Sequence, residues 1–138
     1  MAIAVQTIHP VAHLPLVLGV LRRLEVATVI DRLIPPHPAP GLSCGRGAEA
    51  MVLAILDGHH ALYKVGKRLE ERGMVALLQP GLTRAALNDY RLGHILDALF
   101  AAHRNRGLSA LALQALEVYA IPTPWLPQDT TTLVLYGA

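Results

Sequence analysis

A chain of 138 residues can bury one hydrophobic core but not two independent ones. Hydrophobic residues make up 53% of the chain and its mean hydropathy is +0.40, yet no apolar run approaches the ~18 residues that a membrane-spanning helix needs, so we expect no membrane association. Twelve Lys and Arg against ten Asp and Glu give a net charge of +2, which neither supports nor excludes a nucleic-acid partner.

The first 35 residues predict two short helices. Apolar residues recur at i, i+3, i+4 and i+7 from Leu14 to Leu21, with Pro15 in the first turn, and a similar pattern runs from Val26 to Ile34. The proline-rich stretch 35–38 lacks backbone donors and is expected to end the second helix.

The central part of the chain predicts a buried helix followed by an amphipathic one. Ser43 is the expected N-cap of a helix that runs towards Asp57, and the apolar stretch 48–56 indicates burial on several sides. The glycine-rich stretch 41–47 lacks the Lys-Ser/Thr of a phosphate-binding loop, so we interpret it as a turn leading into that helix. The next helix, up to Gly73, has an apolar stripe and a mostly basic outer face, so the two helices around Gly58 predict a helix-turn-helix-like pair.

The clearest helix begins after Asn88, a predicted N-cap, with Leu87 and Leu92 spaced as a hydrophobic staple. We expect Gly107 to end it, after Arg104 and Arg106 in its last turn. A last helix is predicted before Pro122. The expected buried face of the Asn88 helix consists of Leu92, Ile95, Leu96, Leu99 and Phe100.

The C-terminal residues differ in composition from the helical part. β-branched content rises after Ile121, and residues 129–136 predict a strand that begins with Asp129. The change divides the chain into a helical module, 1–120, and the start of a second domain, 121–138. From the residues alone, Asp129 either caps a turn before a hairpin or serves as a rigidly held metal ligand.

Six short motifs occur in the order in which the DDE insertion-sequence transposases carry them in their N-terminal module: LPLV (14–17), LRRL (21–24), VIDRLIP (29–35), ALNDYRLG (86–93), LDALF (96–100) and DTT (129–131). The chain thus resembles that family nearly end to end. The resemblance implies a mainly α fold, namely a helical bundle with a helix-turn-helix-like pair that ends in the first β-strand of an incomplete RNase H-like domain.

The resemblance also implies a role for Asp129. In that family it would be the first acidic residue of the catalytic triad, where carboxylates hold two Mg²⁺ ions ~4 Å apart. The second Asp and the Glu would lie beyond residue 138, so we expect a truncated chain that has no strand-transfer activity alone.

The partner implied by the resemblance is double-stranded DNA at the terminal inverted repeats of the element. The candidate DNA surface consists of eight basic residues: Arg22, Arg23, Arg46, Lys64, Lys67, Arg68, Arg84 and Arg91. The alternative for these residues is a solvated helix face with its own ion pairs, such as Lys67 with Glu71.

Two other function classes stay open. The apolar faces would also suit a helical protein-interaction or dimerisation module without a catalytic role, so a homo-oligomer is one expectation. A stand-alone helix-turn-helix regulator would use the same helix pair. The single cysteine, Cys44, and the lack of a secretory signal pattern lead us to expect a reducing, cytoplasmic setting.

Overall fold

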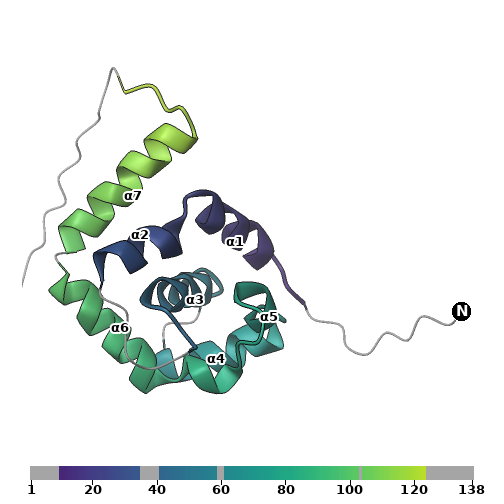
Figure 1. Cartoon of the computed structure of the whole chain (residues 1–138). Coiled ribbons are helices and arrows are strands. Elements are labelled where there is room, and N and C mark those ends of the chain that lie inside the picture. Colours follow the sequence, from purple (N-terminus) through teal and green to yellow (C-terminus); the bar gives the residue numbers. More distant parts are fainter. Residues whose placement is uncertain (1–9, 35–40, 59–60, 103, 124–138) are drawn as a thin grey trace, which may run out of the picture.

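The computed structural model describes residues 10–34, 41–58, 61–102 and 104–123, and every regular element in these ranges is helical (Figure 1). The predicted mainly α class is therefore confirmed for these residues. The predicted strand 129–136, with Asp129, lies outside them. The elements in chain order are α1 (Leu14–Arg23), α2 (Val26–Leu33), α3 (Cys44–Leu56), α4 (Leu62–Glu71), α5 (Val75–Leu78), the 3-10 helix η1 (Arg84–Leu87), α6 (Asp89–Ala101) and α7 (Arg104–Val118).

Helix α3 is the centre of the bundle, and it packs against α1, α2, α4, α5 and α6 (Figure 1). Ala50, Leu53 and Ala54 are almost fully buried, as the apolar stretch 48–56 predicts. The last two residues of that stretch, Ile55 and Leu56, are exposed. The predicted N-cap is confirmed, because the hydroxyl of Ser43 accepts a hydrogen bond from the Arg46 amide at 3.1 Å. None of the helices in the described ranges combines the length and the apolar character that crossing a bilayer requires.

The start of α3 lies very close to α2. A Cβ atom at Gly45 would be 2.2 Å from the carbonyl oxygen of Ala27, so only glycine permits this approach. The amide of Gly45 donates a hydrogen bond to Oδ1 of Asp31 at 2.7 Å, which satisfies one of the free donors at the helix start. The glycine-rich stretch is thus a turn into a capped helix, as predicted, and it also serves helix packing.

A second close approach joins α4 to η1. Val65 and Leu69 bury the predicted apolar stripe of α4, and a Cβ atom at Gly66 between them would be 2.8 Å from the carbonyl oxygen of Arg84. The short helix η1 leads into α6, where Asn88 accepts a hydrogen bond from the Arg91 amide at 2.9 Å and is the predicted N-cap. These contacts set η1 against α4 at the buried Gly66.

The prediction for the end of the Asn88 helix is wrong. Helix α6 ends at Ala101, and Arg104, Arg106 and Gly107 belong to α7, which packs on α2 and α6. A glycine inside a helix costs only about 1 kcal/mol relative to alanine, and here tertiary packing offsets that cost, since the site of a Gly107 Cβ lies 3.6 Å from Leu33. The predicted buried face is also too wide, because Leu96 and Phe100 are exposed.

Candidate nucleic-acid interface

Four of the eight predicted basic residues gather on one side of the molecule. Helix α4 and η1 together form a shallow depression of about 400 Å³, which we call the basic depression. Its lining consists of Tyr63, Lys64, Lys67, Arg68, Glu71 and Arg84. The four cations come from two elements that meet because of the close approach at Gly66.

The cations at the rim of the basic depression are held only loosely. Nζ of Lys67 lies 3.9 Å from Oε1 of Glu71, and Nη1 of Arg84 lies 3.3 Å from Oε2 of Glu70. All four side chains in these two pairs are about half exposed, so solvent screens the pairs and each contributes little to stability. The predicted pair of Lys67 with Glu71 therefore exists, and Glu71 also pairs with Arg68 at 3.3 Å.

Arg68 has a different role, which is structural. Its Nε donates to Oδ2 of Asp57 at 2.8 Å, and Nη2 of Arg72 lies 2.8 Å from Oδ1 of the same carboxylate. The Asp57 side chain is only 3% exposed and sits at the C-cap of α3. Burial alone would raise the pKa of Asp57, but the hydrogen bonds and charges of Arg72 and Arg68 outweigh it and lower the pKa below its usual value. The cluster therefore ties α3 to α4.

The remaining predicted cations lie elsewhere. Arg22 donates to the carbonyl oxygens of Leu77 and Leu78 in the last turn of α5, and the Arg23 guanidinium lies 4.9 Å from the ring centroid of Tyr119. Arg46 forms a 2.7 Å ion pair with the buried Glu49 one turn along α3. Arg91 lines a separate hollow at the start of α6.

Sequence reasoning missed Tyr63 and Arg72. Tyr63 lies in the basic depression with its ring exposed, and Nζ of Lys64 lies 5.5 Å from the centroid of that ring. The sequence does contain a signal for Tyr63, because its position in α4 lies outside the apolar stripe and therefore indicates an exposed ring. Arg72 had no such signal, because its partner Asp57 belongs to the previous helix.

No metal site is found in the described ranges, where no three His, Cys, Asp or Glu side chains come together. The proposed metal ligand Asp129 lies outside those ranges. Cys44, the first residue of α3, is buried. Its burial and, to a smaller extent, the negative charge of Asp31 raise the pKa of its thiol. A raised pKa keeps the thiol protonated, which argues against a nucleophilic role.

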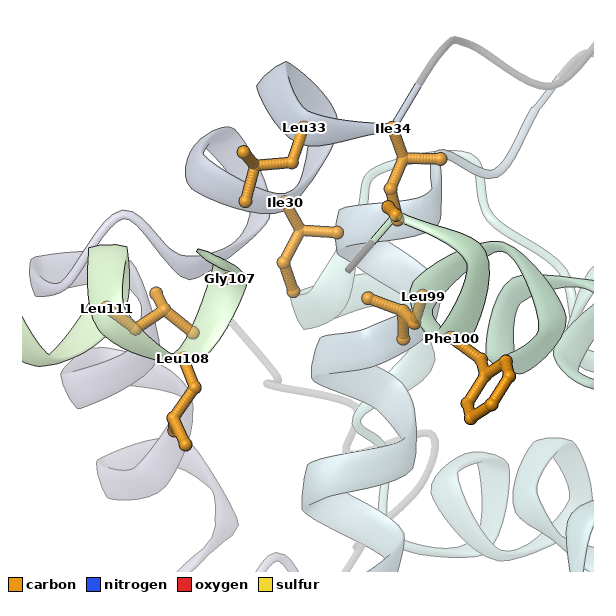
Figure 2. Close-up of a pocket in the computed structure, with 9 residues that line it drawn as sticks. Ile30, Leu33, Ile34, Leu99, Phe100, Gly107, Leu108 and Leu111 are labelled. Atoms are coloured by element: carbon orange, nitrogen blue, oxygen red, sulfur yellow. The ribbon is translucent and has the colours of Figure 1, made fainter. Parts of the chain in front are cut away.

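A second surface feature is an apolar groove of about 350 Å³ between α2, α6 and α7 (Figure 2). Figure 2 shows Ile30 and Leu99 directed into the space between the helices, with the ring of Phe100 projecting at the rim. Phe100 is 70% exposed. The described residues that line the groove are all apolar or glycine: Ile30, Leu33, Ile34, Leu99, Phe100, Ala102, Gly107, Leu108 and Leu111.

The described residues form a small α-helical domain whose surface carries a basic depression and an apolar groove. The chain belongs to the family described as a domain of unknown function, DUF4277, which matches residues 6–113. The matched residues include α1 to α6 and the first part of α7. No curated protein and no solved structure matches the chain.

Proposed function

We propose that this chain is the N-terminal part of a DDE-type transposase and binds the double-stranded ends of an insertion element through the basic depression. The observation that carries the proposal is the gathering of Lys64, Lys67 and Arg84 on one exposed surface. In a helix-turn-helix-like arrangement of α3 and α4, Lys64 and Lys67 lie on the second helix, which is the one that faces DNA in such motifs, and Arg84 adds a cation from η1.

The electrostatics of the depression suit phosphate binding. The pairs of Lys67 with Glu71 and of Arg84 with Glu70 are weak, so both cations are available to bind phosphate. Each phosphate that is bound in this way releases counterions from the DNA. The nearby carboxylates limit the affinity for DNA. Because counterion release contributes to the binding, we expect the affinity to fall strongly as the salt concentration rises.

The wider transposase assignment is supported by the order of the six motifs. Four of them lie entirely within the described residues, at 14–17, 21–24, 86–93 and 96–100. The first two lie in or directly after α1, and the last two lie in η1 and α6. In this proposal Asp129 provides the first carboxylate for Mg²⁺ at the strand-transfer site. One carboxylate cannot position two metal ions, so this chain alone would be inactive.

The DNA-binding proposal is tested by removing two cations from the depression. We expect Lys67→Ala/Arg84→Ala to weaken binding to a blunt duplex about tenfold or more near 0.1 M salt, and to reduce the slope of log affinity against log salt by about two. Fluorescence anisotropy titrations at several salt concentrations measure both quantities.

The matched control is Arg32→Ala/Arg106→Ala, which removes the same charge from exposed positions on α2 and α7 that do not line the depression. We expect this variant to bind nearly as the wild type does. An equal loss in both double variants, or no salt-dependent binding by the wild type, would contradict the proposal.

A second candidate function is self-association through the apolar groove. A two-fold symmetric interface presents the same patch twice, so the patch needs both a projecting group and a hollow. The exposed Phe100 ring at the rim and the ~350 Å³ hollow beside it provide both, and the apolar lining carries no charge that would repel a second copy.

We expect Phe100→Ser to weaken such a dimer at least tenfold without unfolding the protein, because the ring is mostly exposed. Sedimentation equilibrium over a range of concentrations measures the dissociation constant. The control is Leu16→Ser on α1, where the side chain is 76% exposed and lies outside the groove. A wild type that stays monomeric at high concentration would rule this function out.

A further inference from the structure

Tyr63 occupies an unusual position for a large aromatic side chain. Its ring is 68% exposed on α4, while Val65 and Leu69 of the same helix supply the buried contacts with the core. Folding therefore does not require the Tyr63 ring. Instead the ring forms part of the basic depression, next to Lys64, Lys67 and Arg84.

The combination of an exposed aromatic ring and several cations has a specific chemical meaning. Proteins that hold single-stranded nucleic acid stack bases on aromatic side chains and bind the backbone with basic ones. Nζ of Lys64 lies over the Tyr63 ring, 5.5 Å from its centroid, so the flexible lysine side chain has to move aside when a base stacks on that face. Such stacking tolerates any base, because every base has a flat face.

The size of the depression is compatible with one nucleotide. Its volume of about 400 Å³ falls in the range of sites that hold one small molecule. A continuous duplex keeps its bases stacked inside and offers only phosphates to such a hollow, which would leave the Tyr63 ring unused.

We propose that the basic depression holds one unpaired nucleotide, with its base stacked on Tyr63 and its phosphates bound by Lys64, Lys67 and Arg84. This inference rests on the DNA binding proposed above and specifies its substrate. The preferred ligand is a DNA end with unpaired nucleotides rather than an uninterrupted duplex.

The test compares a blunt duplex with the same duplex carrying a short single-stranded overhang. We expect the wild type to bind the overhang about tenfold more tightly in fluorescence anisotropy, and an overhang of abasic nucleotides to lose most of this gain. An overhang containing 2-aminopurine gives a direct signal, because stacking on Tyr63 is expected to quench its fluorescence.

Three variants distinguish stacking on the Tyr63 ring from a polar contact of its hydroxyl. Tyr63→Ala should abolish the preference for the overhang, whereas Tyr63→Phe should keep it because the ring remains. Tyr90→Ala is the matched control, since Tyr90 is 74% exposed but lies edge-on to His94 and does not line the depression. Tyr90→Ala should bind as the wild type does.

Each result decides the inference. Equal losses in Tyr63→Phe and Tyr63→Ala would show that the hydroxyl contacts a phosphate, and the stacking site would be overturned. Equal affinity of the wild type for blunt and overhanging DNA would also overturn it, while leaving duplex binding through Lys67 and Arg84 intact. Binding of neither DNA would overturn both proposals.

Discussion

Gly45→Ala is expected to lower the free energy of unfolding by about 2–3 kcal/mol, because the added methyl group has no space between α2 and α3. Its Cβ would lie 2.2 Å from the carbonyl oxygen and 2.5 Å from the Cα of Ala27, and both of these atoms belong to the backbone. Backbone cannot move aside as a flexible side chain can. The two helices would have to separate, which would also lengthen the hydrogen bond from Gly45 to Asp31.

The same substitution at Gly93 is the matched control. Gly93 lies within α6, and a Cβ built there meets nothing within 4 Å apart from its chain neighbours and the backbone of its own helix. Gly93→Ala should therefore stabilise the protein by about 0.4–1 kcal/mol, since alanine loses less backbone entropy than glycine in a helix. Urea unfolding followed by circular dichroism measures both variants, and a Gly45→Ala variant as stable as the wild type would contradict the close approach of α2 and α3.

Local signals in the sequence predicted most of the helices. Ser43 and Asn88 cap the helices that follow them, and each does so through its own side chain and an amide three residues further on. Such contacts are encoded within one turn of helix, so sequence alone reveals them. The short elements α5 and η1 were missed because four residues span barely one helical turn, so the apolar pattern has no room to repeat.

Contacts between distant segments were not predictable in this way. The spacing of Lys64, Lys67 and Arg68 placed them on one helix, but only the close approach at Gly66 brings Arg84 to the same depression. Spacing also could not show that Arg68 is bound to Asp57, eleven residues earlier and at the end of another helix. Charge on a helix face thus predicted a basic surface, whereas tertiary contacts decide which cations remain available.

Asp57→Asn is expected to lower the free energy of unfolding by about 2–3 kcal/mol at pH 7, because it leaves Arg68 and Arg72 without their shared carboxylate. The carboxylate is nearly buried and pairs with both guanidinium groups at 2.8 Å. Arg72 also donates to the carbonyl oxygen of Pro10 at 2.8 Å, so the cluster links α4 both to α3 and to the segment before α1. The control is Glu70→Gln, which removes the half-exposed partner of Arg84 outside this cluster and should change stability by less than about 0.5 kcal/mol.

The pH dependence of the Asp57→Asn effect gives a stricter test than its size. Although burial opposes it, pairing with Arg72 and Arg68 lowers the pKa of Asp57 in the folded protein, so the folded state binds fewer protons than the unfolded state around the unfolded pKa of about 3.9. The stabilisation is therefore fully present above that pH and is lost as the pH falls through the lower folded value. Urea unfolding measures the free energy of unfolding of wild type and Asp57→Asn from pH 7 down to pH 2.5. The difference between the two proteins should stay constant down to about pH 4 and become smaller below it. A difference that stays constant or grows on acidification would mean that the Asp57 charge does not hold α3 and α4 together.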